Sequence, residues 1–384
     1  MLKKVLLIGN GAREHAIAEA LMRSKYDVEL YVLGGAVNPA LMGLCTEYAV
    51  GDVCDKEFIC DFASRCGVDF AFVGPEAPVA AGVVDALAVV GVPSASPLQT
   101  VGRLESSKGF TRDLVKKYGI PGNPQFKVFH DDDGLEEWFA VLGEDFVVKA
   151  DGLAGGKGVK VSGDHLASVA EGVAYARECL ADGGSVVVEE KFVGQEFSLM
   201  SFCDGSVTVD MPCVQDHKRA YDGDKGPNTG GMGTYSCADG LLPFLSAEDV
   251  AAASEITRKV AAALKEECGV EFKGVMFGGF IAVKEGVRLI EYNARFGDPE
   301  AMSVLPLLKT DFVDICEAII SGDLAELDVE FEAKATVCNY VVPEGYPDKP
   351  LKGEKIEMGA VPEGVGVYYS SVDQREDGLY LSGS

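Results

Sequence analysis

A glycine-rich stretch with two lysines has the composition of a phosphate-binding loop. It is VVKADGLAGGKGVKV, residues 147–161, in which Lys149 lies in an apolar run of strand character. Lys157 stands among glycines, namely Gly152, Gly155, Gly156 and Gly158. A glycine-rich loop between two strands can close its backbone N–H groups over phosphates. We therefore predict that this stretch binds phosphate, with a flexible hairpin carrying surface lysines as the alternative.

The same stretch does not match the Walker A motif. That motif would require glycine at Asp151 and serine or threonine at Gly158, and it would continue into a helix. Here the residues after the loop read as a second strand. The nucleotide-binding loop predicted here is thus of another kind.

A second polar stretch, VRLIEYNARFGDPEAM, places oxygen ligands on a predicted strand. Alternate side chains of a strand share a face, so Glu291 and Asn293 point the same way. A carboxylate and an amide oxygen at this spacing suit Mg²⁺, which also takes phosphates and water as ligands. Arg295, Gly297 and Asp298 follow at once. A structural network of ion pairs is the alternative interpretation.

A third stretch, residues 215–236, concentrates charge before a glycine-rich loop. Asp216, Lys218 and Arg219 lie in QDHKRAYDGDKGPNTGGMGTYS. The whole chain carries a formal net charge of −27. Any anionic substrate would need such a local gathering of basic side chains.

The N-terminal stretch KKVLLIGNGAREHAIAEAL reads as strand, turn and helix. A dinucleotide-binding G-x-G-x-x-G motif would place glycine at Glu14, after Gly9 and Gly11. A carboxylate there disfavours a redox cofactor. Two alternatives remain: the turn only closes a βα unit, or Arg13 and the backbone amides face a small phosphorylated ligand.

Composition limits the classes of function. The acidic balance argues against nucleic acid as a partner, and the longest apolar run, residues 80–92, is too short to span a membrane. The four histidines and 11 cysteines show no zinc-binding spacing. The cysteines read as reduced thiols, which predicts a cytoplasmic protein.

The elements that carry these residues alternate in type along the 384-residue chain, which predicts an α/β protein. Residues 1–95 read as a parallel α/β sheet, and loops after its strands, including GPEAP, would meet at one edge. The stretch LESSKGFTRDLVKKYG is expected to form one helix. Strands and helices then continue to about residue 325, and short strands with many glycines and prolines follow.

The order of these motifs resembles one family. GLAGGKGV, EEKFVGQEFS, QDHKR, GPNTGGMGTYS and IEYNARFGDPE, preceded by IGNGAREHA and VGPEAP, resemble the glycinamide ribonucleotide synthetase family of the ATP-grasp superfamily. The resemblance runs from residue 3 to about 345. It implies an N-terminal α/β domain (1–102), a connecting helix (103–121), a lid subdomain (122–190), a main subdomain (191–328) and a β-rich C-terminal domain (329–384).

The resemblance implies a role for each matching residue. ATP would contact Lys108, Lys149, Gly155, Gly156, Lys157, Gly158, Glu189, Phe192, Val193 and Glu196. Glu291 and Asn293 would bind Mg²⁺ or Mn²⁺. The catalytic residues would be Asp216, Lys218, Arg295 and Asp298, facing glycine and the acyl phosphate. The remaining substrate contacts would be Asn10, Gly11, Arg13, Glu14, Gly74, Pro75, Glu76 and Gly297.

The implied activity is ATP-dependent ligation of glycine to 5-phosphoribosylamine through a glycyl phosphate, by a monomer or weak homodimer. Two alternatives stay open: another ATP-grasp carboxylate–amine ligase, and an ATP-binding chain that is inactive because its C-terminus is short. The C-terminal domain is expected to be incomplete, with an unpaired edge strand near residue 380.

Overall fold

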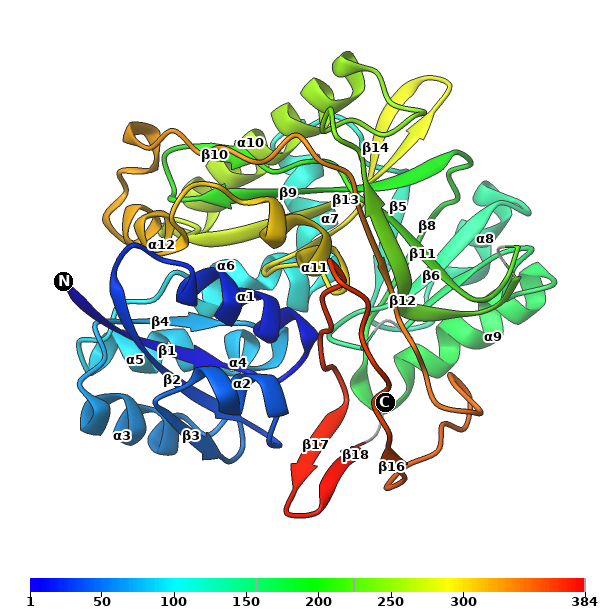
Figure 1. The fold of residues 1–384 in the computed structure, drawn as a ribbon. Coiled ribbons are helices and arrows are strands. Elements are labelled where there is room, and N and C mark those ends of the chain that lie inside the picture. Colours follow the sequence, from blue (N-terminus) through cyan, green and yellow to red (C-terminus); the bar gives the residue numbers. More distant parts are fainter. Residues whose placement is uncertain (156–157, 224, 383–384) are drawn as a thin grey trace.

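The computed structural model describes residues 1–155, 158–223 and 225–382. An N-terminal α/β domain lies beside a larger body with three further sheets, and the C-terminal strands lie below both in Figure 1. The α/β class expected from the sequence is confirmed.

The N-terminal domain is a parallel sheet with the strand order β3-β2-β1-β4. Its strands are β1 (Leu2–Ile8), β2 (Asp27–Gly34), β3 (Glu47–Val50) and β4 (Phe70–Val73). Its helices are α1 (Ala12–Met22), α2 (Pro39–Leu44), α3 (Lys56–Cys66), α4 (Glu76–Ala81) and α5 (Val83–Val89). Ser94 continues the sheet by a parallel bridge to Ala71.

Both faces of this sheet are buried, which explains the continuous apolar run of β1. Leu6 and Ile8 pack into a core under α3 and α5, whereas Val5 and Leu7 pack into a second core on the opposite face. That second core also contains Phe202, Phe296 and Phe312 of the larger body. The N-terminal domain is therefore held against the rest of the chain, and the loops at its sheet edge face residues of that body.

The connection to the larger body differs from the single helix that the sequence predicted. It is two helices, α6 (Gln99–Ser106) and α7 (Lys108–Lys117). Ser107 has an extended backbone, and its hydroxyl accepts a hydrogen bond from the N–H of Phe110. Serine is a favoured N-cap because its side chain satisfies a free amide of the first turn. The break makes Lys108 the first residue of α7.

The lid subdomain has an antiparallel sheet of order β5-β8-β6-β7, which we call the lid sheet. It comprises β5 (Phe126–Phe129), β6 (Phe146–Ala150), β7 (Val159–Val161) and β8 (Val186–Glu190). The helices α8 (Leu135–Leu142) and α9 (Val169–Leu180) accompany it. Phe139 and Phe146 pack edge to face in a small core of its own.

The main subdomain has an antiparallel sheet of order β10-β9-β13-β14, the main sheet. Its strands are β9 (Gln195–Cys203), β10 (Thr208–Asp210), β13 (Gly274–Val283) and β14 (Gly286–Asn293). A second sheet joins β11 (Gln215–Tyr221), β12 (Lys225–Ser236) and β15 (Thr336–Asn339). The helices are α10 (Ala247–Cys268), α11 (Glu300–Val304) and α12 (Phe312–Ser321), with short 3-10 helices at Leu305–Leu307 and Leu324–Glu326. A further 3-10 helix, Ala181–Gly183, follows α9 of the lid subdomain.

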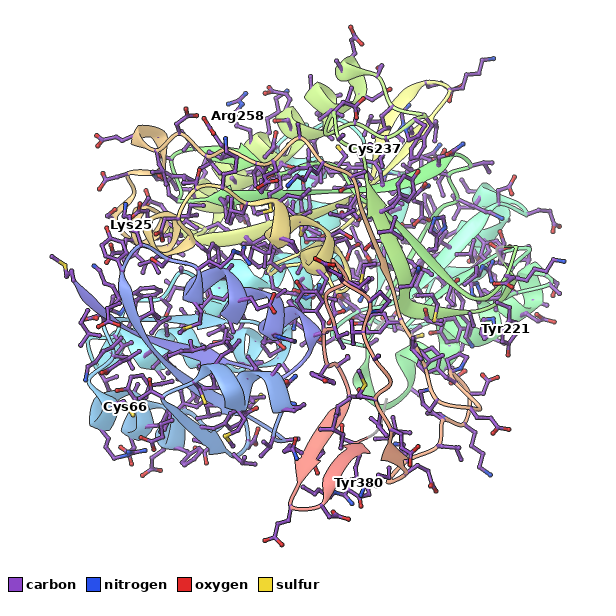
Figure 2. All side chains as sticks on the ribbon, in the orientation of Figure 1. Lys25, Cys66, Tyr221, Cys237, Arg258 and Tyr380 are labelled. Atoms are coloured by element: carbon purple, nitrogen blue, oxygen red, sulfur yellow. The ribbon has the colours of Figure 1, made fainter. Side chains whose placement is uncertain are left out.

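The α12 helix is tied to the N-terminal domain by polar contacts. Lys25 lies at this boundary (Figure 2), and its ammonium is 2.5 Å from the carboxylate of Asp314. The hydroxyl of Tyr26 donates to the same carboxylate at 2.9 Å. These contacts supplement the shared core.

The C-terminal strands are β16 (Lys355–Ile356), β17 (Val372–Arg375) and β18 (Gly378–Leu381). The expected unpaired strand near residue 380 is wrong, because β18 lies between β16 and β17. Tyr380 lies at the outer end of this sheet (Figure 2). The N–H of Gln374 donates to the carbonyl of Val37 at 2.9 Å, so this segment contacts the N-terminal domain.

The 11 cysteines are all unpaired, and Cys66 and Cys237 lie in different parts of the molecule (Figure 2). Among the described residues, no helix has both the length and the apolar character needed to cross a membrane.

Candidate active site

A cavity of about 2270 Å³ lies where the N-terminal domain, the two subdomains and the C-terminal segment meet. Most of the predicted site residues line it. They are Arg13, Glu76, Lys108, Lys149, Gly155, Gly158, Glu189, Phe192, Val193, Glu196, Asp216, Lys218, Glu291, Asn293, Arg295 and Asp298. Gly156 and Lys157 lie outside the described residues. The remaining predicted residues do not line the cavity.

The N-terminal loop is arranged differently from the prediction that Glu14 faces a ligand. Glu14 is only 3 % exposed; one carboxylate oxygen accepts from the N–H of Gly11 and the other from Nε of Arg13, both at 2.7 Å. A side chain at Gly74 would collide with it, because an added Cβ would lie 2.1 Å from Glu14 Oε1. Glu14 therefore positions Arg13 and does not line the cavity.

Five further predicted substrate contacts, Asn10, Gly11, Gly74, Pro75 and Gly297, lie in loops and do not line the cavity. The side-chain oxygen of Asn10 accepts from the N–H of Gly35 at 2.9 Å. The N–H of Gly297 faces the sulfur of Met200 at 3.4 Å. Asn10 and Gly11 precede Arg13, Gly74 and Pro75 precede Glu76, and Gly297 precedes Asp298, so these residues belong to the backbone that carries three cavity-lining side chains.

At the lid, Asp151 anchors the predicted phosphate-binding stretch to α7. Its carboxylate accepts from the backbone N–H groups of Lys108 (2.5 Å), Gly109 (3.3 Å) and Gly152 (3.0 Å). The ammonium of Lys108 donates to the carbonyl of Gly152 at 2.8 Å. The sequence prediction did not include Asp151, although its place directly after the strand of Lys149 was a signal.

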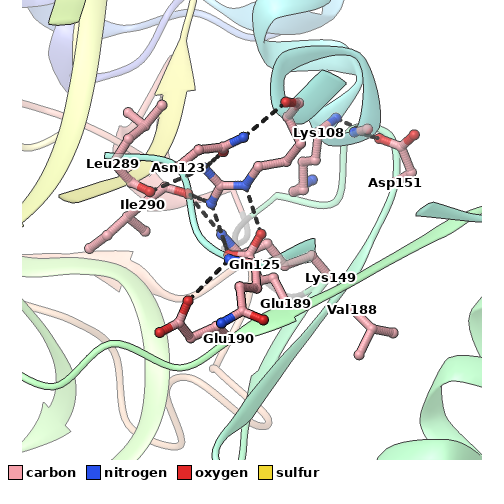
Figure 3. Close-up of polar contacts among 12 residues, drawn as sticks. Lys108, Asn123, Gln125, Lys149, Asp151, Val188, Glu189, Glu190, Leu289 and Ile290 are labelled. Carbon is pink, nitrogen blue, oxygen red and sulfur yellow. Dashed lines mark hydrogen bonds and ion pairs between the residues drawn. The ribbon is translucent and has the colours of Figure 1, made fainter. Parts of the chain in front are cut away.

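Lys149 and Glu189 form a buried ion pair of 2.6 Å (Figure 3). Arg112 pairs with the same carboxylate at 2.7 Å. Burial by itself would raise the pKa of Glu189, but these two cations outweigh it and lower the pKa. The Glu189 side chain, predicted to contact ATP, is therefore already engaged, and Val193, also a predicted ATP contact, is 78 % exposed.

Glu291 and Asn293 of β14 both face the cavity and fit a divalent cation. Burial acts to raise the pKa of Glu291, but Lys218, Lys149 and Lys108 outweigh it, so the carboxylate stays ionised. The amide nitrogen of Asn293 is best oriented toward Glu105 Oε1 at 3.1 Å, which leaves the amide oxygen for a ligand.

The cation would need further ligands from elsewhere. Among the described residues, no three His, Cys, Asp or Glu side chains are grouped to hold a metal. Mg²⁺ and Mn²⁺ accept phosphate oxygens and water alongside few protein oxygens. The donor set thus suits a metal carried in with a nucleotide.

Asp216 and Glu300 bring two carboxyl groups to one wall of the cavity. Burial, with the charge of Glu300 added, raises the pKa of Asp216 to about 8. Glu300 is 3 % exposed, and the hydroxyl of Ser198 donates to it at 3.0 Å. Asp216 Oδ1 is buried without a hydrogen-bond partner among the described residues. Such an oxygen suits the cationic group of a ligand.

The backbone next to Asp216 leaves no room for a side chain. Gly231 has a φ of +138°, and an added Cβ would lie 2.5 Å from the ring of Pro299 and 3.0 Å from Asp216 Oδ1. Lys218 lies 3.4 Å from Glu196. Burial would lower the pKa of Lys218, but Glu196 and Glu291 outweigh it and raise the pKa, so the lysine stays protonated.

Arg295 and Asp298 sit between the main sheet and the N-terminal domain. Arg295 lies 2.9 Å from Glu105 and 3.4 Å from Glu76. The hydroxyl of Tyr340 donates to Asp298. Burial raises the pKa of Asp298, partly offset by Arg13 and by the hydrogen bond from Tyr340.

The sequence prediction missed Glu105, Arg112, Asp151, Glu300 and Tyr340. Glu300 stands at the end of the GDPE motif and could have been found there. Glu105 and Arg112 lie on helices among other charged residues, where nothing in the local pattern separates them from a solvated face. Their burial comes from packing between domains.

Comparison with known proteins gives family matches along most of the chain. Residues 3–105 match the model of the phosphoribosylglycinamide synthetase N domain, and residues 106–301 match that of its ATP-grasp (A) domain. Among curated relatives, the phosphoribosylamine–glycine ligase of Methanosarcina barkeri is 46 % identical over 381 residues, covering 99 % of this chain and 87 % of the relative.

Two further comparisons, one with a curated relative and one with a solved structure, point to the same family. The phosphoribosylamine–glycine ligase of Methanocaldococcus jannaschii is 46 % identical over 391 residues, with 99 % and 88 % of the two chains covered. Among solved structures, the phosphoribosylamine–glycine ligase of Thermotoga maritima aligns with a TM-score of 0.80 at 27 % identity, covering 99 % of this chain and 90 % of that one.

Proposed function

The chain belongs to the phosphoribosylglycinamide synthetase family, and we propose that it ligates glycine to 5-phosphoribosylamine at the cavity described above. The reaction consumes ATP and gives glycinamide ribonucleotide, ADP and phosphate in purine biosynthesis. The observation that carries the proposal is that one cavity is lined by Lys108 and Lys149, by Glu291 and Asn293 of β14, and by Asp216 and Arg295.

The chemistry requires activation of glycine. A carboxylate is a poor acyl donor, because its leaving group would be an oxide; transfer of the γ-phosphoryl group of ATP gives a glycyl phosphate with a good leaving group. Lys108 and Lys149 would face the phosphates. Mg²⁺ or Mn²⁺ at Glu291 and Asn293 would offset phosphate charge, and positioning supplies much of the remaining rate gain.

The two ends of glycine call for opposite charges. Arg295 would face its carboxylate, and Asp216 with Glu300 would face its ammonium group. The unpartnered, buried Asp216 Oδ1 supports this assignment. A bound ammonium group would lower the pKa of Asp216 and replace the proton that burial favours.

The second substrate would approach from the N-terminal domain. Arg13, Glu76 and Asp298 line that side of the cavity. The amine of phosphoribosylamine would attack the acyl carbon of glycyl phosphate there. Closure of the lid stretch that Asp151 anchors would keep water from the acyl phosphate.

We also propose a cytoplasmic location, since 11 free thiols are typical of a reducing compartment. A monomer or weak homodimer stays the prediction for the oligomeric state. Sedimentation over a range of protein concentrations would test it.

The test of function is ADP release by the purified chain with ATP, Mg²⁺, glycine and freshly generated phosphoribosylamine, each omitted in turn. Release that needs every component, with the glycyl amide as product, is the expected result. Release with another amine acceptor would favour a different ATP-grasp ligase. ATP binding without release under any condition would overturn the proposal and favour an inactive chain.

A further inference from the structure

We propose that Arg112 is a positioning residue for ATP. Arg112 pairs with Glu189, so this carboxylate does not cancel the charge of the Lys149 ammonium, and the three side chains together present a net positive charge to the phosphates. The inference rests on the proposed role of Lys149 at this site. Arg112 lies on α7, lines the cavity and is 2 % exposed.

Arg112 and Lys149 contact the same carboxylate, that of Glu189. Its Nε lies 2.7 Å from Glu189 Oε2 and its Nη2 lies 2.8 Å from Glu189 Oε1. The ammonium of Lys149 lies 2.6 Å from the same Oε1. Two cations therefore share one carboxylate, and the arginine engages both of its oxygens.

The summed charge of these three side chains determines how strongly they attract the phosphates of ATP. Arg112, Lys149 and Glu189 together carry a net charge of about +1 when all three are ionised. Without the guanidinium, Glu189 would neutralise Lys149 alone, and the buried group would present no net charge to the phosphates. Because all three side chains are buried, such a change is weakly screened.

Arg112 also fixes the strand that carries the cation-binding face. Its Nη1 donates to the carbonyl of Leu289 at 3.1 Å and its Nη2 to that of Ile290 at 2.6 Å. Lys149 donates to the Ile290 carbonyl at 2.8 Å (Figure 3). Ile290 directly precedes Glu291, so one arginine joins α7, the lid sheet and β14.

The experiment is a double-mutant cycle read by ATP affinity. Isothermal titration with ATP and Mg²⁺ would compare the wild type, Arg112→Gln, Glu189→Gln and the double variant. Arg112→Gln should raise the Kd for ATP about tenfold or more and leave the KM for glycine within about twofold. In the Glu189→Gln background, the same change should raise the Kd less than about threefold, because the carboxylate it offsets is absent.

Two further variants keep the test decisive. Arg112→Lys retains the positive charge and should recover much of the affinity. Arg177→Gln is the matched control, because Arg177 lies on α9 with its side chain 46 % exposed, paired with Asp132 and Glu136, and should leave the Kd unchanged. Circular dichroism would confirm folding. If Arg112→Gln does not fold, Arg112→Lys and Arg112→Met in the Glu189→Gln background carry the comparison.

Two results would overturn the inference. One is an unchanged Kd for ATP in folded Arg112→Gln, and the other is an equal loss of ATP affinity on this substitution in the wild-type and Glu189→Gln backgrounds. The deciding readout, the Kd for ATP, does not depend on ligase activity. A chain that binds ATP in the expected pattern but releases no ADP would contradict the proposed function and leave this inference intact.

Discussion

Arg295 and Glu105 form an ion pair of 2.9 Å that joins the residues after β14 to the last turn of α6. The other oxygen of Glu105 accepts from the N–H of Ala294 at 2.8 Å. One carboxylate thus orients the backbone between Asn293 and Arg295, the two residues proposed to face the cation and glycine.

Glu105→Ala is expected to raise the KM for glycine about tenfold or more, because Arg295 loses its main partner. Stability should fall by about 3 kcal/mol, since removing one member of a buried pair leaves a charge that Glu76 offsets only in part. Steady-state kinetics and urea unfolding would measure both effects. An unchanged KM for glycine in a folded variant would contradict this role for Glu105.

Glu291→Ala is expected to abolish turnover while the fold stays intact, because the cation loses its one carboxylate ligand from the protein. The measurement is ADP release over a Mg²⁺ titration, with circular dichroism for the fold. Glu285→Ala is the matched control, because Glu285 lies on the exposed turn between β13 and β14. Turnover close to wild type at saturating Mg²⁺ would exclude the cation role.

Asp216→Asn is expected to remove a pH dependence of stability. The pKa of Asp216 is raised to about 8 in the folded chain and returns to the ordinary aspartate range on unfolding. Between about pH 4 and 8 the folded state therefore binds the extra proton, and the free energy of unfolding of the wild type falls as pH rises.

The asparagine variant lacks this proton and should be more stable than the wild type at pH 8, with the difference vanishing near pH 4. We expect a difference of at least about 1 kcal/mol at pH 8. Urea unfolding at several pH values without substrate would measure it. Parallel curves for the two proteins would contradict the raised pKa.

Tyr340→Phe is expected to shift the acid limb of the activity profile to higher pH. The hydroxyl of Tyr340 donates to Asp298 and lowers its pKa against the effect of burial. Loss of that donor favours the protonated carboxyl group. The measurement is kcat/KM for phosphoribosylamine against pH. A profile that only changes in height would assign Tyr340 to packing alone.

Much of the fold could be predicted from the sequence because its determinants are local. The apolar run of β1, the stop of α7 before Gly119, and the long amphipathic α10 follow from patterns of period two and 3.6. The break at Ser107 was missed, because an N-cap inside a helical pattern differs from an ordinary serine only in its backbone geometry.

The candidate site, too, could be predicted from the sequence only in part. Lys149, Asp216, Glu291 and Arg295 stand in motifs whose residue types and spacing indicate their chemistry, and the structure brings them to one cavity. The family resemblance implied a substrate contact for Glu14, and in the structure this side chain packs against Gly74 and holds Arg13. Sequence shows which residues are near a loop but not on which side of it a side chain lies.

By itself, the sequence determined the order of the elements, the family motifs and the local charge at each motif. Only the tertiary structure decided which ionisable groups, distant in the sequence, lie close enough to form ion pairs or to shift each other's pKa. Glu189 pairs with Lys149 and Arg112, which lie 40 and 77 residues away in the sequence, and burial beside Glu300 raises the pKa of Asp216. Desolvation and ion pairing depend on three-dimensional distance, which spacing along the chain does not specify.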